Sequence, residues 1–129
     1  MAAHFFNQLR AITSSKLDGD GDWIRTVTLQ CALVFYTDEG ECIEVPQGFE
    51  SDGASVPKAF WSKYPPFGRY LPAAVVHDLL CVQGHAGNCD YTSVESAAIF
   101  QQAMLCCGVG KFKALKMWFA VRYFGPRWD

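Results

Sequence analysis

The chain has 129 residues, of which 50% are hydrophobic and 15% are aromatic, and its formal net charge is −2. A chain of this length builds one hydrophobic core, and this composition excludes an intrinsically disordered protein. The near-neutral charge gives no field that would favour nucleic acid as the main partner, and no apolar run approaches the roughly 18 residues of a membrane span. We therefore expect a single domain over residues 1–129, with no nucleic-acid partner and no membrane span.

The first half of the chain has the composition of a small antiparallel sheet. After a polar lead-in over residues 1–25, the segment 26–36 is rich in β-branched and aromatic side chains. The turn "TDEG" and the alternating "ECIEV" that follow predict a β-hairpin. Glycine, serine and proline then favour an ordered irregular loop, so that hairpin and loop together span 26–57.

Helical patterning begins in the second half, over residues 58–129. A first helix is expected from about Pro72, a favoured first-turn residue, to about Gln83. Gly84 and Gly87 follow, and we expect these two glycines to end the helix.

Two more helices are predicted after this one. Ser93 can cap the second helix, which extends to Gly108. The third helix covers 111–124, and one of its stripes is expected to face the core: Phe112, Leu115, Phe119 and Tyr123, flanked by Trp118. The predicted fold class is therefore α+β, with an N-terminal antiparallel β-hairpin or small sheet followed by three packed α-helices.

The six cysteines are expected to be free, buried thiols, because a core of this size needs no disulfides. In an exported particle, Cys106 and Cys107 are the candidates for a bridge to another subunit. No cofactor or metal is expected. The alternative is a structural zinc site, because histidine and cysteine alternate every four residues at His77, Cys81, His85 and Cys89.

Several ordered motifs resemble one family. They are "VPQGFESDGASVPKAFW" (45–61), "AAVVHDLL" (73–80), "F..AM" (100–104), "GVG" (108–110) and "MWFAVRYFG" (117–125). Together they resemble the small phage and prophage proteins catalogued as domain of unknown function 1353. This resemblance implies a phage origin and no established activity. The chain departs from the family pattern at Ser93 and Ala97, where members typically carry an arginine and an aspartate.

The dipeptide His77-Asp78 is the candidate catalytic feature. It is distantly similar to the active helix of secreted phospholipase A2, where a histidine activates water and the next aspartate holds calcium. If the chain is an enzyme, this similarity implies His77 as general base, with Asp78 or Asp52 binding metal. In that enzyme a second aspartate orients the histidine, and here Ala97 stands at the matching position, so we favour no catalytic role.

The alternative for the same residues is a structural polar site. Adjacent helical residues point about 100° apart, so His77 and Asp78 need separate partners. A buried Asp78 needs hydrogen bonds or a cation, and the candidates are the "SDGAS" loop with Ser51 and Ser55, or Arg122 of the third helix. Asp52 is expected to cap its own loop. The predicted structural polar site comprises Asp52, Ser55, His77, Asp78 and Arg122.

Taken with the resemblance, these features predict a structural protein of a phage virion, made in the host cytoplasm and located in the tail or baseplate. Its expected partners are other virion proteins and further copies of itself, bound through aromatic side chains in excess of what one small core can hide. The alternative is a phospholipase-like or cell-envelope hydrolase used in entry or lysis.

Overall fold

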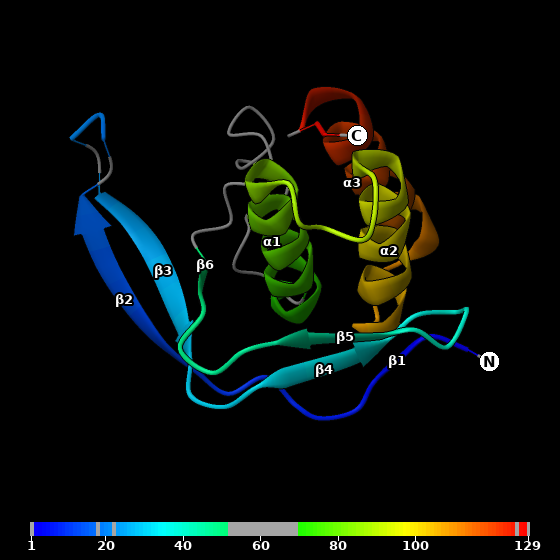
Figure 1. The fold of residues 1–129 in the computed structure, drawn as a ribbon, viewed down its shortest axis with the longest axis horizontal. Helices are drawn as coiled ribbons and strands as arrows, with labels where there is room; N and C mark the ends of the chain where they lie inside the picture. Colours follow the sequence, from blue (N-terminus) through cyan, green and yellow to red (C-terminus); the bar gives the residue numbers. More distant parts are fainter. Residues whose placement is uncertain (1, 18, 22, 52–69, 126, 129) are drawn as a thin grey trace.

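The computed structural model describes residues 2–17, 19–21, 23–51, 70–125 and 127–128. Within these ranges, short antiparallel strands occupy the N-terminal half and three helices follow (Figure 1). The predicted α+β class and its order, sheet first and helices second, are confirmed. Residues 52–69, which include all of the predicted "SDGAS" loop except Ser51, lie outside the described residues.

The predicted hairpin forms two of the three strands of one sheet. Its strands are β4 (Leu33–Tyr36) and β5 (Cys42–Val45), and β1 (His4–Phe5) pairs with the other edge of β4. The turn between them needs a left-handed residue, which Gly40 supplies with a φ of 82°. Alternate side chains of β4 and β5 are buried, so this sheet presents one apolar face to the helices.

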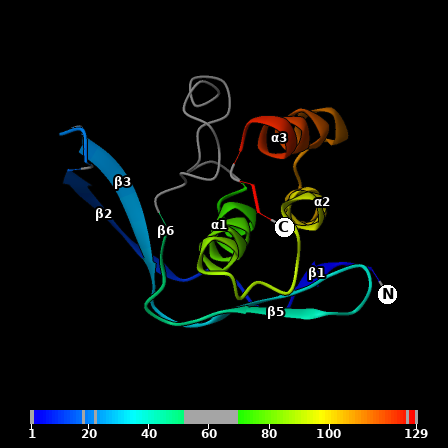
Figure 2. The ribbon, with the colours of Figure 1, turned by 45° about the horizontal axis from the view of Figure 1, so that its top comes forward.

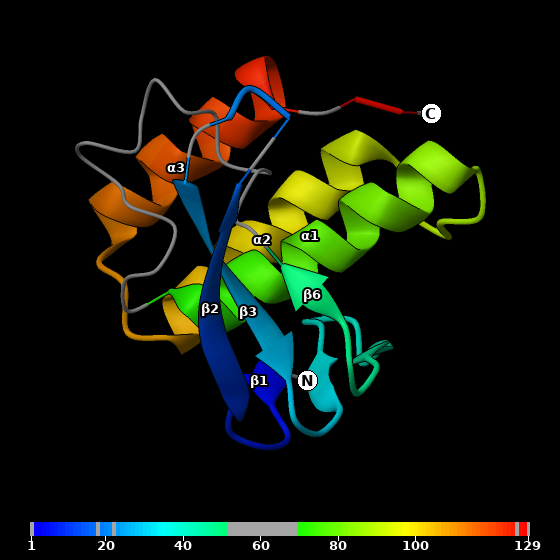
Figure 3. The same ribbon diagram turned by 90° about the vertical axis from the view of Figure 1, so that its left-hand side faces the viewer.

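A second sheet corrects the expectation of one long strand over 26–36. The chain leaves β3 (Trp23–Leu29) and bends before β4, so the segment belongs to two different sheets. The polar lead-in supplies β2 (Ala11–Leu17), which pairs with β3 along its whole length, and β6 (Glu50–Ser51) pairs with the other edge of β3. The β2–β3 hairpin projects away from the helices (Figure 1), and it lies in front of them when that side faces the viewer (Figure 3). This arm was missed because six of the seven β2 residues are exposed.

The first helix, α1 (Leu71–Ala86), runs past its predicted end at Gln83. Gly84 is inside the helix and buried, because the Trp128 indole lies where a side chain at this position would be. Gly87 provides the C-cap in the left-handed conformation, with a φ of 79°. One of the two glycines therefore ends the helix and the other allows close packing.

The second helix, α2 (Ser93–Cys106), has its N-cap one residue before the predicted one. The N-cap is Thr92, whose hydroxyl accepts a hydrogen bond from the Glu95 backbone N–H. The Glu95 carboxylate in turn accepts one from the Thr92 backbone N–H, which completes a capping box. The expectation of Ser93 as cap was wrong because the glutamate that completes the box stands three residues after Thr92.

The bounds of the third helix, α3 (Lys111–Phe124), are confirmed, but its predicted core-facing stripe is wrong. The residues that α3 buries are smaller or more flexible ones: Ala114, Met117, Ala120 and Val121. Small residues allow α3 to approach its neighbours closely, which bulky rings on that side would prevent. The aromatic stripe therefore points outward, with Phe112 83% and Phe119 50% exposed.

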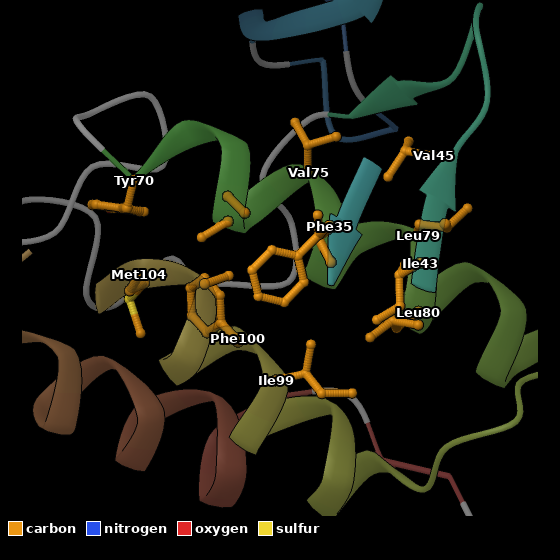
Figure 4. Close-up of a cluster of buried hydrophobic side chains, with 14 of the residues drawn as sticks. Phe35, Ile43, Val45, Tyr70, Val75, Leu79, Leu80, Ile99, Phe100 and Met104 are labelled. Atoms are coloured by element: carbon orange, nitrogen blue, oxygen red, sulfur yellow. The ribbon is translucent and has the colours of Figure 1, made fainter. Parts of the chain in front are cut away.

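The hydrophobic core lies between the β4–β5 sheet and the helices (Figures 2 and 4). The helices α1 and α2 pack side by side and antiparallel, and α3 covers α2 on the side away from the sheet (Figure 2). Phe35 from β4 and Phe100 from α2 meet at the centre, and neither is exposed. None of the helices in the described ranges has both the length and the apolar character that a membrane crossing requires.

Candidate functional site

Asp78 is held by a serine from the neighbouring strand. The Ser51 hydroxyl donates a 2.6 Å hydrogen bond to Asp78 Oδ2, and both residues are buried, with exposures of 1% and 7%. Ser51 reaches this position because β6 pairs with β3 in a register that sets Ser51 opposite Val27. A short bond from hydroxyl to carboxylate in a buried setting ties the second sheet to the middle of α1.

His77 points in another direction and has different neighbours. Its ring is 3% exposed and stacks on Phe100 of α2, with the ring centroids 4.8 Å apart. The Cys81 sulfur, one turn along α1, lies 3.8 Å from Nδ1. Burial lowers the pKa of His77 to about 4, so the imidazole is neutral near pH 7.

Among the described residues, His77 has no partner of the kind that orients a histidine general base. In the described part of the chain, the hydrogen-bonding neighbour of the His77 ring is the Cys81 thiol, whose pKa is raised by burial and then by the Asp78 charge. The residue at the position of the missing orienting aspartate, Ala97, is buried one turn before Phe100. His77 is therefore a packed core side chain with no carboxylate partner in the described ranges.

The other residues of the predicted polar site are not brought together by the described structure. Asp52 and Ser55 lie outside the described residues. Arg122 is on α3, where its guanidinium carbon lies 4.8 Å from the Tyr123 ring centroid. The partner found for Asp78 is Ser51, one of the groups that the "SDGAS" segment offers.

The four residues of the alternative zinc site do not converge. His77 and Cys81 are in contact, but His85 is exposed at the end of α1, 6.5 Å from the Trp128 ring centroid. Cys89 is half-buried against the core. Within the described ranges, no group of three or more histidine, cysteine, aspartate or glutamate side chains is arranged to hold a metal ion.

All six cysteines are free thiols, but of the six only Cys81 is buried as expected. Cys42 and Cys106 are exposed, while Cys81 is buried. Cys106 donates its S–H to the Ala3 carbonyl, 3.1 Å away, and burial raises its pKa. The raised pKa makes Cys106 a poor nucleophile.

Sequence reasoning missed two adjacent hollows beside the β4–β5 hairpin. The first, of about 110 Å³, lies between this hairpin and α2, and the second, of about 140 Å³, lies between β5 and α1. Tyr91 lines both, and burial, followed by the Glu41 charge and hydrogen bond, raises its pKa to about 12. Five exposed carboxylates surround these hollows and are named here the acidic surface: Glu39, Glu41, Glu44, Asp90 and Glu95.

The outward side of α3 carries more of the exposed large apolar side chains than α1 or α2 does. We call it the α3 aromatic face, and it consists of Phe112, Leu115, Phe119 and Tyr123. These four side chains are between 44% and 83% exposed, and the Phe119 and Tyr123 rings lie 4.8 Å apart. Isolated apolar residues on a surface are ordinary, but a continuous row of large ones marks an interaction site.

Comparison with protein families identifies the chain. Residues 27–121 match the model of the family described as "Protein of unknown function (DUF1353)". The chain belongs to this family. The match agrees with the motif resemblance seen between residues 45 and 125, and it includes the end of β3, all of β4, β5, β6, α1 and α2, and most of α3. The family description gives no activity.

Two curated relatives come from Sinorhizobium fredii (strain NBRC 101917 / NGR234), and both are described as uncharacterized proteins. One, y4jT, is 40% identical over 86 residues, which is 65% of this chain and 24% of the relative. The other, y4iH, is 37% identical over 81 residues, which is 61% of this chain and 32% of the relative. The chain thus spans about a quarter to a third of their lengths. No solved structure matches it.

Proposed function

We propose that this chain is a structural protein of a phage virion, located in the tail or baseplate, and that it acts by binding neighbouring proteins. The observation that carries the proposal is the α3 aromatic face. Covering large aromatic side chains is a main source of free energy in protein association. Phe112 and Phe119 contribute little to the core of this domain, so their apolar surface is available to a partner.

The buried polar residues support a structural function in a second way. The Ser51 hydroxyl donates a hydrogen bond to the Asp78 carboxylate and so links β6 to α1. His77 fills core volume against Phe100. Both arrangements fix the relative positions of the sheets and helices. The phage setting rests on the motif resemblance to proteins encoded mainly in phages and prophages.

The alternative function, a phospholipase-like or cell-envelope hydrolase with His77 as general base, receives less support. A general base must reach the proton that it abstracts, and the His77 ring is 3% exposed. Its lowered pKa also makes it a weak base. Lipid and cell-wall hydrolysis by the purified chain, lost in His77→Ala, would favour this alternative over ours.

The direct test is mass spectrometry of purified particles from a strain that encodes this chain. We expect the chain in the particles at a constant ratio to the other tail proteins. Complementation with Phe112→Ser/Phe119→Ser should reduce its incorporation, whereas Phe6→Ser should not. Phe6 is the matched control because it is 71% exposed and lies outside α3. Absence of the unmodified chain from the particles would reject the proposal.

A further inference from the structure

Charge is strongly segregated along this chain. Residues 26–57 and 70–110 contain no lysine or arginine, whereas residues 111–128 contain five and no acidic residue. The small net charge is therefore a sum that includes two regions of opposite sign. The structure places the first region on the β4–β5 sheet, α1 and α2, and the second on and after α3.

The positive region surrounds the α3 aromatic face. Lys111, Lys113, Lys116 and Arg122 all belong to α3, and at 100° per residue they lie on both sides of the row from Phe112 to Tyr123. The Arg122 guanidinium stays on this surface, over the Tyr123 ring. A partner that covers the aromatic face must therefore meet cations along both edges.

The negative region coincides with the acidic surface around the two hollows. Glu39 and Glu41 come from the hairpin turn, Glu44 from β5, Asp90 from the connection between α1 and α2, and Glu95 from the first turn of α2. Tyr91 and the buried Ile99 provide an apolar floor in the first hollow. This surface thus combines carboxylates at its edge with apolar atoms at its base.

We propose that the α3 aromatic face of one copy docks on the acidic surface of a second copy, so that the chains associate head to tail. The proposal rests on the proposed function for its use of α3 as a contact surface, and it names the partner and the receiving surface. Cations would meet carboxylates at the edge, and an aromatic side chain such as Phe112 would enter the hollow floored by Ile99.

Charge excludes the symmetric alternative for the same helix. If two copies paired through α3 alone, four cations would face four cations with no acidic residue of that helix between them. A contact between two different surfaces avoids this repulsion. Such a contact leaves one surface of each kind unused at the ends, so it continues into a ring or a filament rather than stopping at a dimer.

A charge-swap experiment tests this contact. One variant, Lys111→Glu/Lys116→Glu, reverses the sign beside the aromatic face, and the other, Glu39→Lys/Asp90→Lys, reverses the acidic surface. All four positions are exposed, so folding should be retained, and thermal unfolding followed by circular dichroism checks this. Sedimentation velocity at low salt, over a concentration series, then measures association of each protein and of their equimolar mixture.

We expect the unmodified chain to associate with increasing concentration and to dissociate as salt screens the charges. Each swapped variant alone should bind itself about tenfold more weakly or worse. The equimolar mixture should regain association, because each changed surface then finds an oppositely charged partner. Phe112→Ala should also weaken association, and Phe6→Ala should not.

Three results would overturn the inference. A monomeric unmodified chain at every concentration would reject this contact, and its incorporation in particles would show that the proposed function survives. Stronger association of the Lys111→Glu/Lys116→Glu variant would indicate a symmetric α3 contact. Binding of the unmodified chain to vesicles of anionic phospholipid, lost in that variant and without self-association, would assign α3 to a membrane surface.

Discussion

The hydroxyl of Ser51 and the carboxylate of Asp78 lie 2.6 Å apart and join a two-residue strand to the middle of α1. Among the described residues, β6 is joined to β3 through two residue pairs. The side-chain bond to Asp78 supplies a second attachment. It also gives one of the buried carboxylate oxygens a donor, which a charge in this position requires.

Ser51→Ala should therefore destabilise the protein by about 1–3 kcal/mol, because a buried carboxylate loses a hydrogen-bond donor. Chemical denaturation measures this change. In a double-mutant cycle with Asp78→Ala, we expect a coupling energy of at least about 0.5 kcal/mol. Ser15→Ala is the matched control on exposed β2, and its effect should stay within about 0.5 kcal/mol. A coupling energy near zero would contradict a direct bond.

The burial of His77 makes stability depend on pH. Its pKa falls from 6.5 to about 4 on folding, so between these values the unfolded chain binds more protons than the folded one. The contribution of His77 is complete above pH 6.5 and is lost progressively as the pH falls towards 4. The full difference of pKa corresponds to roughly 3 kcal/mol.

Chemical denaturation at several pH values, for the unmodified chain and for His77→Phe, isolates this contribution. The variant removes the titrating group and keeps a ring against Phe100, so its stability should fall less between pH 6.5 and 4.5. His85→Gln, at an exposed position on the same helix, should leave the slope unchanged. Equal slopes for His77→Phe and the unmodified chain would show that His77 is accessible to protons in the folded state.

The N-cap of α2 gives two neighbouring hydroxyl residues, Thr92 and Ser93, different effects on stability. Thr92→Ala should cost about 1 kcal/mol, because the Glu95 backbone N–H loses its acceptor at the helix N-terminus. Ser93→Ala should change stability by less than about 0.5 kcal/mol, because Ser93 is already inside the helix. Thermal unfolding of the two variants compares them directly. If Ser93→Ala destabilised the protein more than Thr92→Ala, the N-cap would be Ser93 and not Thr92.

These results show which features local sequence patterns can predict here. The β4–β5 hairpin and the bounds of α3 follow from alternation, turn residues and helix periodicity, and the structure confirms them. The face of α3 does not follow, because Phe112 and Met117 are both apolar and only the space beside α2 decides which is buried. Apolar periodicity finds a helix more reliably than it finds its inner side.

Local sequence patterns also predict only part of the polar site. Helical geometry shows that His77 and Asp78 need separate partners, and this was predicted. The actual partner, Ser51, depends on how β6 pairs with β3, which is a contact between segments far apart in the sequence. The acidic surface likewise needs residues 39–44 and 90–95 to meet, and neither segment has a motif of its own.

Gly84 lies against the Trp128 indole, so this position should not tolerate a side chain. In an exposed helix, glycine to alanine stabilises by up to about 1 kcal/mol through backbone entropy. At this position an added Cβ would lie 2.2 Å from the Trp128 indole, which also donates a 2.7 Å hydrogen bond to the Tyr91 carbonyl. The clash and the loss of this hydrogen bond should outweigh the entropy gain, so Gly84→Ala should destabilise by about 1–3 kcal/mol.

Denaturant unfolding measures this change, and acrylamide quenching of fluorescence should detect a more accessible tryptophan. Gly19→Ala is the control, since a Cβ there meets nothing within 4 Å. In a Trp128→Ala background the clash is absent, so Gly84→Ala should become neutral or stabilising. A stabilising effect in the unmodified background would mean that Trp128 does not occupy this groove of α1, and that the chain after α3 is not held against the connection between α1 and α2.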